Sequence, residues 1–389
     1  MKINEGKIKE ILERGVSGII EKSHLERALR SGKKLRVKFG IDPTSPDLHL
    51  GHAVPFRKLK QFQEVGHEII FIIGDFTARI GDPSGRESAR KPLTPKEVKS
   101  NLKKYLSLAG KIINIKNAKM LCNSKWLANT DTLLRLASIG SIQYVMKRDE
   151  FRTRQVGGQE ITILEAMYPL FQGYDSVKIG ADVEVGGADQ ELNLLAGRKL
   201  QKYFGQKEQD ILMTPLLTGT DGVRKMSKSF SNYIALNDAP QDMFGKIMSL
   251  PDNLLEQYFL LSTDVPMEEA KKLLGRKPFE AKKVLAYEIV KLYHRENFAN
   301  KAREYFEKTF SKKEIPENLR IYRAKVNEEW ADFLTREKLI SSHSEAKRLI
   351  EGGGLDFNGK KIARAGEQIS ESGTVKIGKY KFIKIDVRA

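Results

Sequence analysis

Residues 35–73 read LRVKFGIDPTSPDLHLGHAVPFRKLKQFQEVGHEIIFII, and the spacing of apolar residues changes twice along them. The stretch opens with apolar and polar side chains in alternation, the period of two that is typical of a strand with one buried face. The turn-forming run DPTSPD at 42–47 ends that strand, and apolar residues then recur at helical spacing. After Gly66, the uninterrupted apolar run at 69–73 predicts a second strand, buried on both faces.

A strand, a helix and a second, fully apolar strand form the unit from which parallel sheets are built. The sequence therefore predicts an α/β fold with a Rossmann-like, doubly wound parallel sheet, and we expect this domain to span 33–235. Ahead of it, residues 1–32 carry apolar side chains at helical spacing among charges. That pattern predicts a short N-terminal helical extension.

The remainder of the chain has two further patterns. Residues 236–320 are predicted to form a helical domain, because their apolar side chains fall into two helical stripes, Val284, Leu285, Ile289 and Leu292, then Phe298, Ala302, Tyr305 and Phe306. Residues 323–389 begin with two helical stretches and continue as short, Gly-rich alternating runs. This last segment is predicted to be a small α+β module.

Bulk properties limit the classes of protein that fit. With 389 residues, 40% of them hydrophobic, the chain can bury a core and form about two or three domains. A net charge of +18 is compatible with a polyanionic partner, but cationic surfaces also serve solubility. The single Cys122 excludes an internal disulfide and a thiolate metal cluster. The sequence has no apolar run near the ~20 residues that span a bilayer and no signal peptide, so we expect a cytoplasmic protein with no membrane association.

The first polar motif lies where the first strand gives way to its helix. Asp42 and Thr44 are followed by His49, Gly51 and His52. In an open parallel sheet, ligands bind beyond the carboxyl ends of the strands, and the first turn of a helix presents free N–H groups to phosphates. Gly51 would let a nucleotide approach the backbone, and the imidazoles would donate hydrogen bonds as neutral or cationic groups. Taken alone, the string HLGH could equally arise by chance.

The second motif is the string KMSKS, in a loop about 175 residues after HLGH. Its members are Lys225, Met226, Ser227, Lys228 and Ser229. Two lysines in a mobile loop can close over a triphosphate and stabilise the charge that develops as pyrophosphate leaves. A solvated basic loop is the ordinary explanation of a lone KxxK pattern, but the full string in company with HLGH favours a nucleotide site.

HLGH with KMSKS resembles the paired signatures of the class I aminoacyl-tRNA synthetases. Further strings are FGIDPTSPDLHLGH at 39–52, GDFTARIGDPSGR at 74–86, YPLFQGYDS at 168–176 and VGGADQ at 185–190. Together, over nearly the whole chain, they resemble the bacterial tyrosyl-tRNA synthetases. The tryptophan enzymes are the nearest relatives, but they do not carry the GDPSG and YxxxQxxD strings in this arrangement.

The resemblance implies a ligase that activates L-tyrosine with ATP to tyrosyl-adenylate and pyrophosphate. The enzyme then transfers tyrosine to the 3′-terminal ribose of tRNA(Tyr). ATP with Mg²⁺ is a substrate complex in this reaction, and no tightly bound cofactor or protein-held metal is expected. The family also implies an inserted segment near 120–160 that builds a homodimer, with tRNA bridging both subunits. The helical domain would then lie on the anticodon side.

The string YPLFQGYD places Tyr168, Gln172 and Asp175 on one face of a helix, since they are spaced by four and three. A phenol, an amide and a carboxylate that converge on a pocket could hold an amino acid. The resemblance implies that Asp175 accepts the hydrogen of the substrate phenol, and that Tyr168 and Gln172 face its α-ammonium. Asp82, in GDPSG, would add negative charge for that ammonium. Without the companion motifs, a capped and partly exposed helix face would explain the same residues.

The string VGGADQ joins a tight turn to polar side chains. Gly187 would allow close backbone approach, Asp189 could accept both ribose hydroxyls, and Gln190 would face the tyrosine carboxylate or the adenylate. An ordinary Gly-Gly turn explains the glycines equally well. Arg86 and Arg90 follow the GDPSG string, and the resemblance implies that they hold the departing pyrophosphate, although unaided arginines could also be surface charges.

The C-terminal string SEAKRLIEGGGLDFNGKKI at 344–362 resembles an RNA-binding module first described in a small-subunit ribosomal protein. Its candidate contacts to a phosphate backbone are Ser344, Lys347, Arg348, Lys360 and Lys361. Fourteen Lys and Arg against ten Asp and Glu in residues 323–389 are only a mild excess. The expected binding of tRNA therefore depends on the motif and not on charge.

The chain departs from the better-known branch of the family at Lys38, where that branch has a tyrosine that helps bind the substrate phenol. Lys38 is therefore a candidate for tyrosine binding. It could hydrogen-bond the phenol oxygen, pair with Asp175, or point elsewhere, and the sequence leaves all three open.

The expected chemistry needs no covalent nucleophile, because the tyrosine carboxylate attacks the α-phosphorus directly and catalysis is positioning plus electrostatic stabilisation. The groups expected to meet the charge on the β and γ phosphates are Thr44, His49, Lys225, Lys228, Arg86 and Arg90. Those expected near the nucleoside are Gly51, His52 and Asp189, and Asp42 is expected to contact ATP. No residue stands out as a general base for the transfer to tRNA. Two alternatives remain: an RNA-binding protein that has lost catalysis, against which the intact motifs argue, and a nucleotidyl-transfer enzyme for a small molecule, against which the tRNA-side domains argue.

Overall fold

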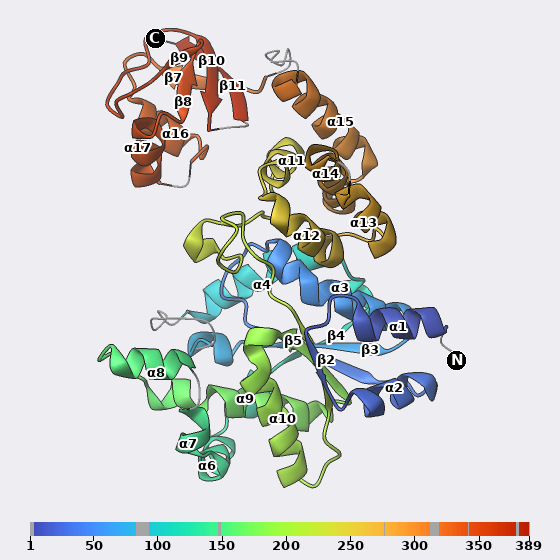
Figure 1. The fold of residues 1–389 in the computed structure, drawn as a ribbon. Helices are drawn as coiled ribbons and strands as arrows, with labels where there is room; N and C mark the ends of the chain where they lie inside the picture. Colours follow the sequence, from blue (N-terminus) through green and yellow to red (C-terminus); the bar gives the residue numbers. More distant parts are fainter. Residues whose placement is uncertain are drawn as a thin grey trace. The chain divides into compact units, whose positions relative to one another are not determined.

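The computed structural model describes residues 4–82, 93–146, 149–275, 277–311, 319–340, 342–378 and 381–388. The chain divides into two compact units, Met1–Asn237 with Leu250–Ala281, and Asp238–Ser249 with Lys282–Ala389. Each unit contains its own sheet (Figure 1). Across the described ranges, no helix combines the length and the apolar character needed to cross a membrane.

The first unit is built on a six-stranded sheet in the order β1-β6-β5-β2-β3-β4. All neighbouring strands are parallel except β1, which is antiparallel to β6. The strands are β1 (Gly18–Ile20), β2 (Arg36–Ile41), β3 (Glu68–Ile73), β4 (Lys119–Cys122), β5 (Val183–Gly187) and β6 (Asp210–Thr214). The predicted Rossmann-like, mostly parallel sheet is confirmed.

The two strands that decided the prediction differ in how they are buried. β3 is buried on both faces as expected, with Ile69 through Ile73 at most 2% exposed. β2 was expected to have one buried face, yet Lys38, on its polar side, is fully buried. A charged side chain can occupy such a position only with partners, so the sheet is covered at Lys38, whereas Arg36 and Gly40 on the same side are exposed as the alternation predicts.

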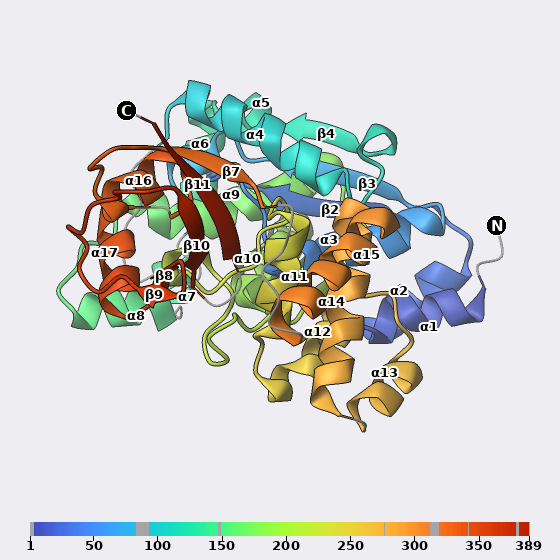
Figure 2. The same cartoon turned by 90° about the horizontal axis from the view of Figure 1, so that it is seen from above.

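Helices cover both faces of this sheet. Figures 1 and 2 show α3 and α4 on one face and α9 and α10 on the other. The helices of the first unit are α1 (Glu5–Glu13), α2 (Lys22–Arg30), α3 (Leu50–Glu64), α4 (Pro95–Ala109), α5 (Ser124–Leu127), α6 (Thr130–Ile139), α7 (Ile142–Val145), α8 (Asp149–Val156), α9 (Ile163–Ile179), α10 (Glu191–Tyr203), α12 (Leu255–Ser262) and α13 (Met267–Leu274).

Helix α9 carries the predicted amino-acid site, and local sequence sets both of its ends. Thr162 and Glu165 form a capping box at its start, and Gly180 ends it with φ at 56°, a left-handed conformation that glycine adopts without strain. At Gly173 the helix approaches α10 so closely that a Cβ would lie 2.8 Å from the carbonyl carbon of Ala196. The close contact holds α9 firmly against the sheet and its neighbour.

The predicted N-terminal helical extension at 1–32 contains the helices α1 and α2, but Gly18–Ile20 form β1 between them, which the sequence did not predict. β1 pairs with Ile211–Met213 of β6 and so closes one edge of the sheet. The sequence GII offers only three residues, too few to show a strand periodicity. Likewise, the inserted segment expected near 120–160 overlaps β4, which belongs to the central sheet, so its helices α5 to α8 begin only after Cys122.

The predicted helical domain at 236–320 consists of helices, but residues 250–281 group with the first unit. In the second unit lie α11 (Pro240–Met248), most of α14 (Pro278–His294), which begins in the first unit, and α15 (Glu296–Phe306), which continues as a π-helical turn at Glu307–Ser311.

The C-terminal part of the second unit is an α+β fold, as predicted. Its sheet runs β7-β11-β10-β8-β9, with β7 parallel and the other pairs antiparallel. A separate core of buried side chains surrounds Trp330 and Phe333. The elements are β7 (Ile321–Lys325), α16 (Trp330–Arg336), α17 (His343–Glu351), β8 (Leu355–Phe357), β9 (Lys360–Lys361), β10 (Gly373–Ile377) and β11 (Lys381–Arg388).

Candidate active site

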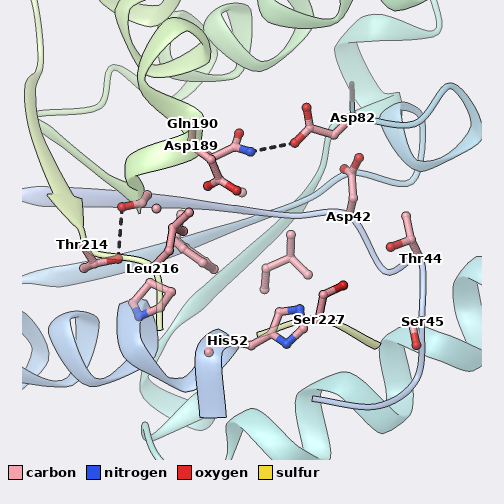
Figure 3. Close-up of a pocket in the computed structure, with 18 of the residues that line it drawn as sticks. Asp42, Thr44, Ser45, His52, Asp82, Asp189, Gln190, Thr214, Leu216 and Ser227 are labelled. Atoms are coloured by element: carbon pink, nitrogen blue, oxygen red, sulfur yellow. Dashed lines mark hydrogen bonds between the residues drawn. The ribbon is translucent and has the colours of Figure 1, made fainter. Parts of the chain in front are cut away.

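A cavity of about 750 Å³ lies beyond the carboxyl ends of β2 and β5. The chain leaves β2 toward β3 on one side and β5 toward β6 on the other, so these strands flank a switch point, where open α/β sheets bind ligands. Figure 3 shows residues from both strand ends and from the two signature motifs around this space. The predicted residues that line it are Asp42, Thr44, His49, Gly51, His52, Asp82, Tyr168, Gln172, Asp175, Gly187, Asp189, Gln190, Lys225, Met226, Ser227 and Ser229.

The histidines of HLGH stand at the start of α3, and both are neutral. The backbone N–H of His49 donates to Nδ1 of His52 at 3.3 Å, so the ring proton of His52 lies on Nε2. Burial, with the charge of Lys228, lowers the pKa of His52 to about 4, and burial lowers that of His49 to about 2. Nδ1 of His49 is buried without a hydrogen-bond partner among the described residues. These rings therefore offer a ligand neutral hydrogen-bonding groups, not charges.

Gly51 serves the histidine ring as much as any ligand. A Cβ on Gly51 would lie 3.1 Å from both Cε1 and Nδ1 of His49, which is tighter than ordinary contact. The motif alone predicted this glycine only for the approach of a nucleotide. The structure adds that a side chain here would press on the ring that faces the cavity.

The KMSKS loop is tied by its backbone to HLGH. Residues 234–236 pair with residues 48–50 through two hydrogen bonds of 3.0 and 2.8 Å. Inside the loop, the buried side chain of Asn232 accepts from the N–H of Ser227 at 2.8 Å and donates to the carbonyl of Lys225 at 3.1 Å. These hydrogen bonds give the loop backbone a defined course.

The two lysines of the loop have different partners. Nζ of Lys225 lies 2.9 Å from Oδ2 of Asp189, across the cavity mouth. Nζ of Lys228 donates to Oγ of Ser45 and, at 2.6 Å, to the carbonyl of Asp47, and Lys228 is not among the described residues that line the cavity. A ligand that needs Asp189 or Lys225 must therefore replace one ion pair.

The side chains of Asp82, Gln190 and Asn193 form a small polar cluster, of which Asp82 and Gln190 line the cavity (Figure 3). Nε2 of Gln190 donates to Asp82 at 2.7 Å, and Nδ2 of Asn193 donates to Oε1 of Gln190 at 2.8 Å. The amide of Gln190 is thereby oriented with its nitrogen toward Asp82. Sequence analysis did not find Asn193, whose role appears only once α10 is folded.

Asp175 is a buried carboxyl that lines the cavity and has a strongly raised pKa. It is 3% exposed, and Oδ1 accepts from Nε1 of Trp126 at 2.8 Å while Oδ2 accepts from Nδ2 of Asn123 at 3.4 Å. Burial raises the pKa of Asp175 to about 7, against the lowering effects of Lys38 and of these two donors. A buried carboxylate held by neutral donors is a strong acceptor for one further hydrogen bond.

Tyr168 is anchored through Asp42. Its hydroxyl donates to Oδ2 of Asp42 at 2.9 Å, and Thr77 donates to Oδ1 at 2.7 Å. A Cβ at Gly74 would lie 1.9 Å from that same Oδ1, so only glycine fits there. With its proton committed, the Tyr168 oxygen retains lone pairs for a cation such as an ammonium. Asp42, predicted near ATP, is thus engaged on the amino-acid side.

Gln172 and Lys38 share the buried Glu184. Nε2 of Gln172 lies 3.2 Å from Oε1 of Glu184, and Nζ of Lys38 lies 2.9 Å from the same oxygen. Lys38 also donates to the carbonyl of Gln172 at 2.6 Å and to Oγ of Ser176 at 2.8 Å. Its three donors are used, so of the three options left open by the sequence, Lys38 points elsewhere. The assignment of Lys38 as a direct contact of tyrosine was therefore wrong.

The remaining predicted residues fall outside this cavity. Arg86 and Arg90 lie outside the described residues. Ser344, Lys347 and Arg348 stand exposed on α17, and Lys360 and Lys361 are exposed on β9, all in the second unit. The C-terminal cations are therefore accessible on the surface of their own module.

The residues that sequence analysis missed are chiefly those that support the others. Asn123 and Trp126 hold Asp175, Thr77 and Gly74 hold Asp42, and Tyr105 and residues 215–217 add to the lining. One signal was available, since the chain has only two tryptophans and Trp126 closely follows a strand. The others have no distinguishing pattern in the sequence.

Comparison with known proteins agrees with this geometry. A family model described as tRNA synthetases class I (W and Y) matches residues 30–311. The tyrosine–tRNA ligase of Aquifex aeolicus is 46% identical over 383 residues, which cover 96% of this chain and 97% of the relative. That of Thermotoga maritima is also 46% identical, over 388 residues, 97% of this chain and 96% of the relative. The chain belongs to the class I tRNA synthetases of the tryptophan and tyrosine group.

Solved structures show the same fold. A C-terminally truncated mitochondrial tyrosyl-tRNA synthetase of Aspergillus nidulans superposes with a TM-score of 0.65 at 23% identity, over 79% of this chain and 95% of the other. The tyrosyl-tRNA synthetase of Archaeoglobus fulgidus, complexed with L-tyrosine, gives 0.62 at 22% identity, over 77% and 99%. Within the family, the relatives of high identity and coverage named above are tyrosine–tRNA ligases.

Proposed function

We propose that this chain is a tyrosine:tRNA ligase, which forms tyrosyl-adenylate from L-tyrosine and ATP and then esterifies tRNA(Tyr). The observation that carries the proposal is the buried carboxylate of Asp175 in the cavity that HLGH and KMSKS also line. A carboxylate with an open acceptor position recognises a phenol, and the two motifs recognise a nucleotide beside it. Full-length similarity to tyrosine–tRNA ligases supports the same conclusion.

The amino-acid half of the site accounts for each group of tyrosine. Asp175 accepts the phenol hydrogen in a charge-assisted bond. The α-ammonium lies between the Tyr168 oxygen, the side chain of Gln172 and the carboxylate of Asp82, which Gln190 and Asn193 orient. No residue has to become a covalent nucleophile, because the carboxylate of tyrosine attacks the α-phosphorus of ATP itself.

The nucleotide half uses the helix start and the loop. His52 and the unpartnered Nδ1 of His49 bind neutral oxygens or ring nitrogens of the nucleotide, and Gly187 and Asp189 receive the ribose. ATP enters as its Mg²⁺ complex, which neutralises part of the triphosphate charge. Lys225 leaves Asp189 for the phosphates as the ribose takes its place, so the carboxylate exchanges one partner for another.

Lys228, with Thr44, meets the charge that grows on pyrophosphate. Its present contacts to Ser45 and Asp47 hold it next to the strand end that also carries Thr44. Arg86 and Arg90 are proposed for the same pyrophosphate on the basis of the sequence motif alone. Stabilisation of this kind acts mostly in the transition state and affects the rate more than ground-state binding.

A homodimer is part of the proposal. Large apolar side chains are exposed on the helices after β4 and at the start of α9, namely Leu134 at 65%, Ile142 at 74%, Val156 at 91%, Ile163 at 80% and Leu164 at 49%. Soluble monomers rarely expose that much apolar surface in one segment, and a second copy of the chain would cover it.

The residues that bind the tRNA backbone are Ser344, Lys347, Arg348, Lys360 and Lys361. Because tRNA charging takes place where translation does, the proposed compartment is the cytoplasm.

The decisive experiment is pyrophosphate exchange with each of the twenty amino acids, followed by charging of purified tRNA(Tyr). Exchange with a much higher kcat/KM for tyrosine than for phenylalanine or tryptophan is expected. Exchange that prefers another amino acid would refute the substrate, and the absence of exchange with intact ATP binding would indicate an RNA-binding protein without catalysis.

A further inference from the structure

Beneath the amino-acid half of the site lies a buried ion pair that no step of the reaction requires. Lys38 on β2 and Glu184 on β5 are neighbours in register across the parallel strands, and both are fully buried. Burying two charges costs several kcal/mol each, and replacing such a pair with well-packed apolar residues is often neutral or stabilising. Stability is therefore a poor reason for this pair.

The contacts of the pair point to α9. The Lys38 ammonium holds the carbonyl of Gln172 at 2.6 Å and the hydroxyl of Ser176 at 2.8 Å. Glu184 holds the side-chain amide of Gln172 at 3.2 Å and the hydroxyl of Ser176 at 3.0 Å. Gln172 and Ser176 bracket Asp175 along the helix, so the pair grips the turn that carries the phenol acceptor.

The pair is closely packed against α10. A Cβ at Gly197 of α10 would lie 2.6 Å from Nε2 of Gln209 and 3.2 Å from Oε2 of Glu184. Gln209 also donates to that carboxylate oxygen. Each oxygen of Glu184 thus has two donors, and each donor of Lys38 has one acceptor. The two charges are thus satisfied, although Oε1 of Gln209 has no partner among the described residues, and a buried network of this kind rigidifies what it touches.

We propose that Lys38 and Glu184 are positioning residues for tyrosine recognition, which fix the Gln172–Ser176 turn of α9 and set the electrostatic field at Asp175 without touching the substrate. This inference rests on the proposed role of Asp175 as phenol acceptor. The charged and titratable groups that face Asp175 are Lys38 from β2, Glu184 from β5 and Tyr168 from α9, while Asn123 and Trp126 contribute neutral donors.

The two members of the pair act on Asp175 with opposite sign. Lys38 favours the ionised carboxylate and lowers its pKa, whereas Glu184 disfavours it and raises the pKa. Removing each charge should therefore move the titration of Asp175 in opposite directions. A purely structural pair would give two variants that are both less stable but share one pH profile.

The test is the pH dependence of kcat/KM for tyrosine in pyrophosphate exchange, which reports the pKa of groups in the free enzyme. The acid limb of this profile is the range in which kcat/KM falls as the pH is lowered. In Lys38→Met, this limb should move to higher pH by about one unit or more. In Glu184→Gln, which keeps an acceptor for Gln172, it should move to lower pH. Phenylalanine lacks the phenol, so its profile should lack this limb in every form of the enzyme.

The matched control is Lys58→Met. Lys58 is also a buried lysine of the first unit, but its ammonium binds the carbonyls of Glu10, Ile11 and Arg14 at the end of α1. This variant should lose stability with no movement of the acid limb. If Lys38→Met fails to fold, Glu184→Gln still decides, because its shift has a predicted sign.

If the acid limb for tyrosine stays in place in Lys38→Met and Glu184→Gln, or moves in the same direction in both, the positioning role is overturned. Failure of the proposed function looks different, because in that case the unaltered enzyme itself would show the same acid limb for tyrosine and phenylalanine, or would activate neither.

Discussion

Replacing Asp175 by Asn should stabilise the protein above pH 7 while it damages the choice of tyrosine. Burial raises the pKa of this carboxyl from 3.8 to about 7. A raised acid pKa means that the folded state holds a proton which the unfolded state releases, so stability falls as pH rises from about 4 to about 7. At 1.36 kcal/mol per unit, the full loss above pH 7 is roughly 4 kcal/mol.

The gain from Asn is smaller than this loss, because of the neighbours of Asp175. An amide oxygen can still accept from Trp126, but the amide nitrogen would face Nδ2 of Asn123, whose own oxygen already accepts from the N–H of Phe76. One buried donor without a partner costs about 1–3 kcal/mol. The net gain at pH 8 should be about 1–3 kcal/mol, and near pH 5, where most of the carboxyl is protonated in the folded state, it should vanish.

Urea unfolding at pH 5 and pH 8 measures the effect. The chain has two tryptophans, and in a Trp330→Phe background only Trp126, which contacts position 175, reports on the first unit. In the Asp175→Asn variant, the ratio of kcat/KM for tyrosine to kcat/KM for phenylalanine should fall roughly 10- to 100-fold. This factor corresponds to the loss of one charge-assisted hydrogen bond. If the Asn variant is less stable than the parent at pH 8, or if it keeps the original ratio, the reasoning about this carboxylate is wrong.

Three further predictions concern the loop, the C-terminal module and the dimer. Lys228→Ala should slow adenylate formation about 10²-fold in rapid-quench kinetics and leave the Kd for tyrosine unchanged. Replacement of the exposed Lys116 by Ala is the control. A normal rate with weakened tyrosine binding would contradict the prediction. A chain ending near residue 320 should still form adenylate, since the module beyond that residue has its own core. The shortened chain should charge tRNA poorly and bind it with a shallower salt dependence. Full charging by the shortened chain would reject the module's role. The double variant Leu134→Glu, Ile142→Glu should sediment as a monomer, with half the mass of the parent dimer. Val326→Glu in the second unit should leave the sedimenting mass unchanged. A double variant that remains dimeric would place the interface elsewhere.

The sequence predicted those parts of the fold and site in which one short segment carries the whole signal. The uninterrupted apolar run at 69–73, which follows a strand and a helix, predicted a strand buried on both faces, and HLGH and KMSKS each bring several functional groups within a few residues. The face of α9 was equally readable, because Tyr168, Gln172 and Asp175 are related by helical spacing alone. Local periodicity is enough for features of this kind.

What the sequence could not predict depends on which strands become neighbours. Lys38 had three possible roles until β5 was placed beside β2 in a register that sets Glu184 opposite it. Asn123 and Trp126 reach Asp175 only because β4 ends near α9, and Gly18–Ile20 form a strand only because the edge of β6 was open. These contacts join segments far apart in the chain, and no spacing within one segment encodes them.

The backbone pairing of residues 234–236 with 48–50 has a consequence for the speed of the reaction. With one end held there and the other by the hydrogen bond from Met226 to Leu217, the stretch between these two fixed points is short. The entropy lost on closing a loop grows with the number of residues between its fixed ends. Most of this conformational entropy is lost when the chain folds. Each catalytic cycle therefore has to fix only the short stretch that carries Lys228.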